Sequence, residues 1–204
     1  KKIRRDLFAS HRMNLWYNLN EPLSGFPVAH TPNLLTQGTP VTINNETHHI
    51  QRLIPRAFTD DYDLELDFTL NSNTPANPSS AGGFGVYFNG AVVNTGNTAK
   101  YDGHIYQYDT SAGKALLFHH VNNGVAGASI DFKHAFHHFP WMNGLWNNAH
   151  TMKIEVRKKN VKVYIDGILV NNMNMSSRYH EYSVVGFRTW GIANISVSRI
   201  IYVE

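Results

Sequence analysis

The stretch that decides the fold is Thr151–Asn171, TMKIEVRKKNVKVYIDGILVN. In Met152–Arg157 and in Val161–Asp166, apolar and polar residues alternate with a period of two, which is typical of a β-strand with one buried face. Asp166 and Gly167 form a two-residue hairpin signal, because a type I′ turn needs positive φ at both positions. The stretch therefore predicts a three-stranded antiparallel meander. Such a meander is stable only when its apolar face packs on a second sheet.

Similar alternation continues through most of the chain, and it is clearest in Asp63–Leu70, where every second residue is Leu or Phe. Further strands are expected at Val41–Asn44, His48–Ile54, Gly82–Phe88, His104–Asp109, Lys114–Val121, Ile168–Val170, Val184–Trp190 and Ile195–Val203. The apolar positions predict a core that includes Leu66, Phe68, Val86, Ile154, Val156, Val163, Ile165 and Phe187. Many short strands with little helix predict an all-β antiparallel sandwich or barrel.

Three segments do not follow this alternation. Ile3–Leu19 has a ragged i, i+4 apolar spacing, which predicts a short helix. Glu21–Pro40 is rich in Pro and Gly and is expected to be irregular, and Asp131–Asn148 is expected to be a long aromatic loop. We therefore divide the chain into an N-terminal extension, residues 1–40, packed on or flanking a single β-sandwich domain, residues 41–204.

Composition excludes several classes of protein. The 204 residues are 42% hydrophobic and 16% charged, which fits a globular protein, and the absence of Cys excludes disulfides. Four of the 18 basic residues lie in residues 1–5, so 14 bases face 15 acids elsewhere and no nucleic-acid partner is expected. No apolar run approaches the roughly 20 residues of a membrane-spanning helix. The chain begins without Met, so we expect a processed product or part of a longer protein.

Several of these stretches occur together, in the order found in one superfamily. Asp63–Leu70, Gly82–Phe88, Trp146–Gly167, and Val184–Gly191 with Ile195–Val203 resemble the concanavalin A-like lectin/glucanase superfamily, and within it the laminin-G-like domains. The resemblance covers about four-fifths of the chain. It implies a jelly-roll β-sandwich of two curved sheets, with ligands on the concave face or at a loop rim. Its members include lectins, glycosidases, polysaccharide lyases and adhesive modules.

Glu65 and Asp67 are the candidates for catalysis. Their positions on one strand place both carboxylates on the same face, about 6.5–7 Å apart along the backbone. That distance lies between the spacings of retaining and inverting glycosidases. The family-16-like β-glucanases carry three acids, as E-x-D-x-x-E or E-x-D-x-E, whereas this chain has Leu70 or Thr69 at the third position. We therefore assign no catalytic residue; a binding role and a plain solvated strand face are the other interpretations.

Aromatic residues suggest a sugar-binding face, because the C–H face of a sugar stacks on aromatic rings while its hydroxyls need fixed polar partners. His104, Tyr106 and Tyr108 share one face of a strand, and Tyr87 shares a face with two glycines. The candidate ligand-binding residues are Tyr87, His104, Tyr106, Tyr108, Glu65, Asp67, Arg188 and Trp190. The alternative for the aromatic residues is packing between the two sheets.

Neither metal motif in the sequence is strong. Lys133–Pro140 (KHAFHHFP) holds three His but lacks the Glu of the H-E-x-x-H zinc motif, so ordinary loop histidines are expected. Asn94, Asn97 and Asp102 offer oxygen ligands with a single carboxylate. A polar turn is the default interpretation there, and a weak calcium site is the alternative. We expect no cofactor.

These observations favour a non-catalytic carbohydrate-binding or adhesive lectin-like module of a surface or secreted protein, with a glycan or polysaccharide as its partner. A glycoside hydrolase or polysaccharide lyase of the same fold is one alternative. The structural globular head of a pilus-like or virion-surface subunit is another. A homo-oligomer or a multidomain parent chain is compatible with all three, and the expected location is extracellular or on the cell surface.

Overall fold

The computed structural model is built from β-strands. It describes residues 4–6, 16–18, 41–43, 48–52, 61–72, 82–95, 98–109, 114–120, 126–134, 148–175, 184–191 and 193–203. These residues form strands, turns and short connections without a helix. Within this part of the chain, no helix has the length and apolar character needed to cross a membrane.

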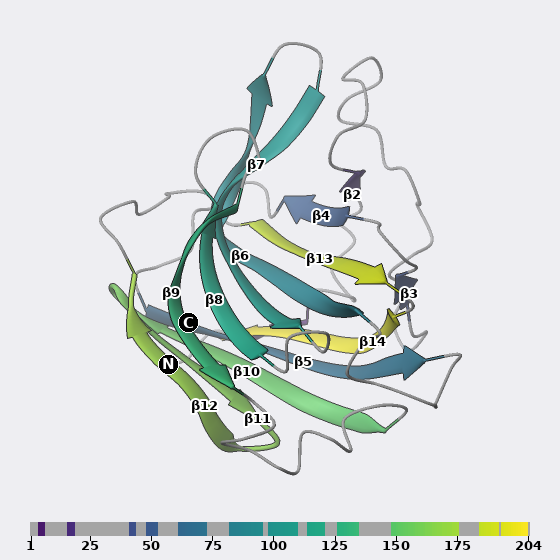
Figure 1. Ribbon diagram of the computed structural model, residues 1–204, viewed down its shortest axis with the longest axis vertical. Helices are drawn as coiled ribbons and strands as arrows, with labels where there is room; N and C mark the ends of the chain where they lie inside the picture. The colour runs from purple at the N-terminus through teal and green to yellow at the C-terminus, as the bar shows by residue number, and fades with distance from the viewer. Residues whose placement is uncertain are drawn as a thin grey trace.

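Fourteen described strands form two antiparallel sheets, which lie as two layers with β7, β8 and β9 visibly curved (Figure 1). The first sheet has the order β1-β14-β5-β10-β11-β12, and β3 also pairs with β14. Its strands are β1 (Arg4–Asp6), β3 (Val41–Ile43), β5 (Asp61–Ser72), β10 (Ala149–Arg157), β11 (Asn160–Ile165), β12 (Ile168–Asn174) and β14 (Ala193–Val203). The second sheet has the order β2-β4-β13-β6-β7-β8-β9. Its strands are β2 (Trp16–Asn18), β4 (His48–Arg52), β6 (Gly82–Thr95), β7 (Thr98–Asp109), β8 (Lys114–His120), β9 (Ala126–His134) and β13 (Val184–Gly191).

The predicted meander is confirmed. β10 pairs with β11 and β11 with β12, and the turn residues Asp166 and Gly167 have φ of 51° and 79°, as a type I′ turn requires. A β-bulge between Val163 and Tyr164 shifts the register of β12 against β11. The predicted sandwich, rather than a barrel, is also confirmed, because the two sheets form separate hydrogen-bonded ladders.

Two predictions were wrong. Arg4–Asp6 and Trp16–Asn18, inside the expected helix, are strands that pair with β14 and β4, because pairing with a sheet edge outweighs a weak local helical spacing. Asp131–His134, at the start of the expected loop, belongs to β9, which pairs with β8. The Ala- and Gly-rich beginning of β9 gives little strand signal in the sequence.

The core lies between the two sheets, where Phe68 of the first contacts Phe84 of the second with ring centroids 5.0 Å apart. Seven of the eight predicted core residues are buried: Leu66, Phe68, Val86, Ile154, Val156, Val163 and Ile165. The side chain of the eighth, Phe187, lies outside the described residues. The alternating pattern therefore identifies the inner face of β5, β10 and β11 correctly.

Ile165 and Ile168 give a matched test of this core, because they flank the same turn. Ile165 is fully buried, whereas Ile168 is 43% exposed. Ile165→Ala should lower the free energy of unfolding by about 2–5 kcal/mol, since it removes buried methyl groups and leaves a cavity. Ile168→Ala should cost about 1 kcal/mol or less. Urea unfolding with equal losses for both variants would contradict the assignment of the two faces.

Candidate functional site

The outer face of the first sheet is polar, because the residues that alternate with the core residues of β5, β10 and β11 are charged or hydroxyl-bearing. The ladder register aligns them in rows across the strands. The rows are Asp63–Glu155–Lys162 and Glu65–Lys153–Tyr164, followed by the pair Asp67–Thr151. This face therefore brings the two predicted carboxylates, Glu65 and Asp67, beside bases and an aromatic ring.

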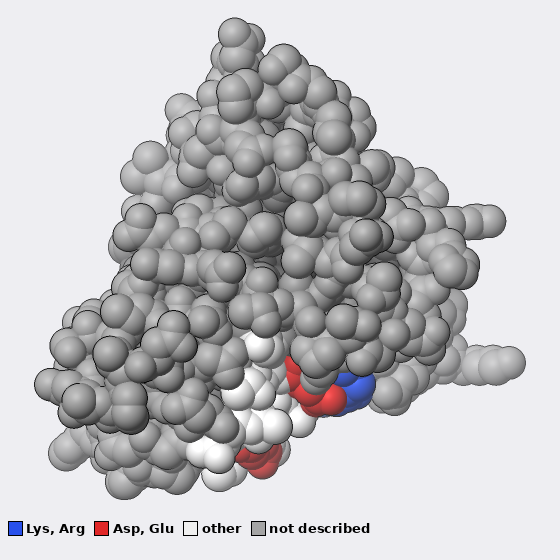
Figure 2. Space-filling view, turned by 90° about the vertical axis from the view of Figure 1, so that its right-hand side faces the viewer, with Lys and Arg blue, Asp and Glu red and all other residues white. Residues whose placement is uncertain are grey.

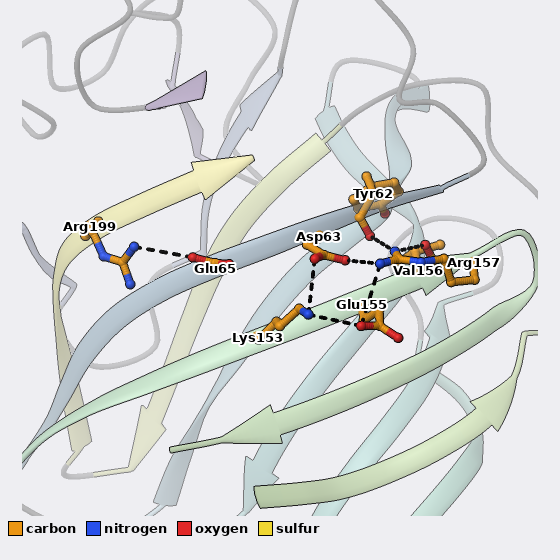
Figure 3. Close-up of polar contacts among 8 residues, drawn as sticks. All are labelled: Tyr62, Asp63, Glu65, Lys153, Glu155, Val156, Arg157 and Arg199. Carbon is orange, nitrogen blue, oxygen red and sulfur yellow. Dashed lines mark hydrogen bonds and ion pairs between the residues drawn. The ribbon is translucent and has the colours of Figure 1, made fainter. Parts of the chain in front are cut away.

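Lys153, at the centre of these rows, forms two ion pairs. Its Nζ lies 3.1 Å from Asp63 Oδ2 and 3.0 Å from Glu155 Oε2. Arg157 Nη2 binds Asp63 Oδ1 at 2.8 Å and lies 3.6 Å from Glu155 Oε2, so two bases and two acids form one network (Figure 3). Burial acts to lower the pKa of Lys153 and Arg157, but the hydrogen bonds and charges of Asp63 and Glu155 together outweigh it and raise both pKa values. The network fixes Lys153 in one position.

Arg199 holds Asp67 with two hydrogen bonds. Its Nε donates to Asp67 Oδ2 at 2.6 Å and its Nη2 to Oδ1 at 2.8 Å, a bidentate arrangement. Thr151 Oγ1 also donates to Asp67 Oδ1 at 3.0 Å. The hydrogen bonds from Arg199 lower the pKa of Asp67. Burial opposes this shift, and the hydrogen bond from Thr151 adds to it. Asp67 is therefore held as a carboxylate, whereas the general acid of a glycosidase needs a raised pKa.

A hollow of about 480 Å³ opens on this face. The described residues that line it are Glu65, Thr151, Lys153, Glu155, Tyr164 and Gly167. Lys153 Nζ lies 5.7 Å from the centroid of the Tyr164 ring, within the range of a cation–π contact. In Figure 2, which shows one side of the molecule, acidic and basic side chains lie directly beside each other on the described surface.

Asp166 fixes the turn at the rim of this hollow. Its Oδ1 accepts a hydrogen bond from Thr151 N at 2.9 Å, and its Oδ2 lies 2.6 Å from His150 Nδ1. Its backbone N also donates to Thr151 O at 2.8 Å. The β11–β12 turn is therefore anchored to the start of β10, which holds Gly167 in place beside Thr151.

The sequence identified only part of this site. The stretch that predicts the meander contains Thr151, Lys153 and Tyr164. Its alternation identified the buried residues, and the residues on the opposite face were not predicted to bind a ligand. Arg199 lies on β14, and the sequence gives no local indication that it pairs with Asp67. The signal that could have found the other three is that their side chains lie on the same outer face of the sheet as Glu65.

The predicted aromatic residues do not form one face. In the β6–β7 ladder Tyr106 lies opposite Val86 and Tyr108 opposite Phe84, so both share the inner face that contacts Phe68. Tyr87 lies opposite Ile105 and therefore faces the other way. Grouping Tyr87 with Tyr106 and Tyr108 was wrong, because one-residue alternation separates them.

All four of these side chains are buried. Tyr106, Tyr108 and His104 have no exposed surface and Tyr87 has 2%. His104 Nδ1 lies 3.3 Å from Asn89 O. Burial raises the pKa of Tyr106, and the nearby Tyr108 and Asp131 add to the effect. For His104, Tyr106 and Tyr108 the arrangement corresponds to packing between the two sheets, whereas Tyr87 is buried on the other face of the second sheet. A ligand on the outer face of the first sheet does not reach these residues.

Arg188 and Trp190 lie on β13 of the second sheet, opposite Gly85 and Gly83 of β6. Their side chains lie outside the described residues. Glu65 and Asp67 point outward from the first sheet, so the core separates them from the tyrosines of the second. The structure therefore does not gather the eight predicted residues into one site.

Among the described residues, no three His, Asp or Glu side chains converge on a point where a metal ion could bind. Asn94 lies on β6 and Asp102 on β7, opposite Ala99 and Ala91, so they belong to the ladder of a hairpin rather than to one loop. The position of Asn97 lies outside the described residues.

Tyr106 gives a test of its buried environment. Its hydroxyl has no hydrogen-bond partner within the described protein. Tyr106→Phe should therefore leave the free energy of unfolding unchanged or raise it slightly, because a buried unpaired polar group is removed. Tyr106→Ala should cost about 3–5 kcal/mol through the cavity it leaves. A cost above about 1 kcal/mol for Tyr106→Phe in urea unfolding would contradict the assignment of this hydroxyl.

The Asp67–Arg199 pair predicts a pH dependence. Because the pKa of Asp67 is lower in the folded state than in the unfolded chain, the pair stabilises the fold above about pH 4 and loses this effect as the pH falls through the folded pKa. Asp67→Asn should cost about 0.5–1 kcal/mol at pH 6, since both groups are about one-third exposed. The difference from the wild type should shrink as the pH is lowered towards 3. A constant difference would contradict the ionic role of Asp67.

The fold is similar to that of several solved sugar-binding proteins. Carbohydrate binding module CBM66 from Bacillus subtilis matches with a TM-score of 0.52 and 15% identity, over 92% of this chain and 94% of that chain. The Ca²⁺-bound exoplasmic/lumenal domain of VIP36 matches with a TM-score of 0.57 and 14% identity, over 95% of this chain and 85% of that chain. The carbohydrate recognition domain of Emp47p matches with a TM-score of 0.55 and 11% identity, over 98% of this chain and 93% of that chain.

No family model matches the sequence, and no curated protein does. At these identities the likeness concerns the fold alone. It agrees with the resemblance to the concanavalin A-like superfamily at the level of a two-sheet antiparallel sandwich.

Proposed function

We propose that this chain is a non-catalytic, lectin-like carbohydrate-binding module and that its ligand binds in the hollow on the outer face of the first sheet. The observation that carries the proposal is the composition of that hollow, which sets the ring of Tyr164 beside the polar groups of Glu65, Lys153 and Glu155. Its volume of about 480 Å³ lies within the range of small-molecule sites.

The groups of the hollow suit a sugar. A pyranose presents an apolar C–H face, which can stack on the half-buried Tyr164 ring. Its hydroxyls can donate to the carboxylates of Glu65 and Glu155 and accept from the third N–H of Lys153, while the Thr151 hydroxyl, which donates to Asp67, can itself accept. The ion pairs of Lys153 and the anchored turn at Gly167 hold these groups in place before the ligand arrives, which lowers the entropic cost of binding.

Binding is favoured over hydrolysis by the state of Asp67. Of the two predicted carboxylates, Asp67 is already paired with Arg199 and its pKa is lowered, so it does not suit a general acid. Thr69 occupies the position of a third acid on this strand. A hydrolase would need Glu65 as the general acid, with the ionised Asp67, already paired with Arg199, as the second carboxylate.

The solved neighbours support this proposal, since they include a carbohydrate binding module and a VIP36 domain with Ca²⁺ and Man2 bound. We extend it to a glycan or polysaccharide partner, an extracellular or cell-surface location and a laminin-G-like subgroup. Residues 41–204 are proposed as the binding domain, with residues 1–40 as an N-terminal extension that adds β1 and β2 to its two sheets. A homo-oligomer, or a longer multidomain chain, would supply the avidity that weak sugar sites need.

Of the predicted site residues, Glu65 contacts the ligand in this proposal, whereas Asp67 is paired with Arg199 and does not. Arg188 and Trp190 stay as predictions on the second sheet. Tyr87, His104, Tyr106 and Tyr108 are left out of the hollow.

A glycan array probed with a multivalent form of the protein tests the proposal, because avidity makes weak sites visible. Tyr164→Ala should lower the signal at least severalfold, whereas Tyr164→Phe should retain most of it by keeping the ring. Ile168→Ala, an exposed apolar residue outside the hollow, is the matched control and should bind like the wild type.

A positive array on which Tyr164→Ala binds like the wild type would move the site elsewhere. Release of reducing sugar that disappears in Glu65→Gln would favour the hydrolase. A blank array with correctly folded protein would favour the structural head.

A further inference from the structure

The charges around the hollow are unevenly balanced. The described residues of its lining include two carboxylates, Glu65 and Glu155, and one ammonium, Lys153. Lys162, opposite Glu155 in the β10–β11 ladder, lies on the same sheet face but does not line the hollow. Among the described residues that line it, the sum of the charges is therefore negative.

Three bases near the hollow, Lys153, Arg157 and Arg199, are already paired with acids. Lys153 binds Asp63 and Glu155, and Arg157 binds the same two acids. Arg199 directs two of its three nitrogens at Asp67. An incoming anion would therefore have to compete with carboxylates that these bases already bind.

The two glutamates, in contrast, are only partly paired. Glu65 contacts Arg199 Nη1 through Oε2 at 3.4 Å, a long contact. Glu155 contacts Lys153 and Arg157, again through Oε2. In the described contacts, Oε1 of each glutamate has no partner, although the side chains of Glu65 and Glu155 are only 27% and 18% exposed. A carboxylate oxygen with no protein partner can accept from a charged donor of a ligand.

We infer that this hollow prefers a cationic amino sugar to its N-acetylated form and disfavours acidic sugars. The inference rests on the proposed function, and it adds the charge class of the ligand. The ammonium of a 2-amino-2-deoxy sugar would donate to Oε1 of Glu65 or Glu155 while the ring stacks on Tyr164. Outside residues 1–5 the chain has 14 bases and 15 acids and is close to neutral, so the preference arises from the groups of the hollow and not from a long-range field.

The test compares three oligosaccharides of equal length: chitosan tetramer, its fully N-acetylated form and tetragalacturonate. Calorimetric or interferometric titration at low salt, at a pH that protonates the amines, should give chitosan tetramer about a two- to fivefold lower Kd than the acetylated form, the range of a partly exposed ion pair. Tetragalacturonate should bind more weakly than both. The preference for the amine should shrink as salt is raised.

Glu65→Gln should weaken binding of both forms, because the carboxylate also accepts from sugar hydroxyls, but it should weaken binding of the amine form more, so that much of the preference for the amine is lost. Asp61→Asn is the matched control, because it makes the same carboxylate-to-amide change on the same strand outside the hollow, and it should keep the preference. Equal binding of both forms by the wild type, or strongest binding of tetragalacturonate, would overturn the inference but leave the binding module. Absence of binding to glycans of every charge class would instead refute the proposed function.

Discussion

The contact between the two sheets sets the arrangement of everything else. Phe68 of β5 meets Phe84 of β6, and around this contact the inner side chains of both sheets are buried. Because strand side chains alternate, fixing the inner face of β5, β10 and β11 also fixes the outer face. The polar row of Glu65, Lys153 and Tyr164 therefore lies on the outer face because the residues that alternate with them form the hydrophobic core.

This coupling explains why the fold could be predicted from the sequence while the site was predicted only in part. In β10 and β11 one face is buried and the other is polar, so alternation reports the fold directly. In β6 and β7 both faces are buried: Val86 and Tyr106 on one side, Tyr87 and Ile105 on the other. Alternation of polarity is then lost, and the sequence does not indicate which tyrosines share a face.

The same reasoning separates the site residues that could be found from those that could not. Glu65 and Asp67 were identified because they lie on a clean alternating strand. Tyr164 lies in an equally clean strand, and the cross-strand register that places it in the row of Glu65 follows only from the paired sheet. Arg199 reaches Asp67 across the β14–β5 ladder beside a register shift, which no local pattern predicts.

The central claim is that ligands bind on the outer face of the first sheet and not among the buried tyrosines of the second. Nuclear magnetic resonance shift mapping during titration with a bound glycan tests it most directly. The account predicts that the backbone amide signals of Thr151, Lys153 and Gly167 move most, while those of β6 and β7 stay nearly fixed. The largest shifts at Val86, Tyr106 and Tyr108, with Lys153 unchanged, would contradict it.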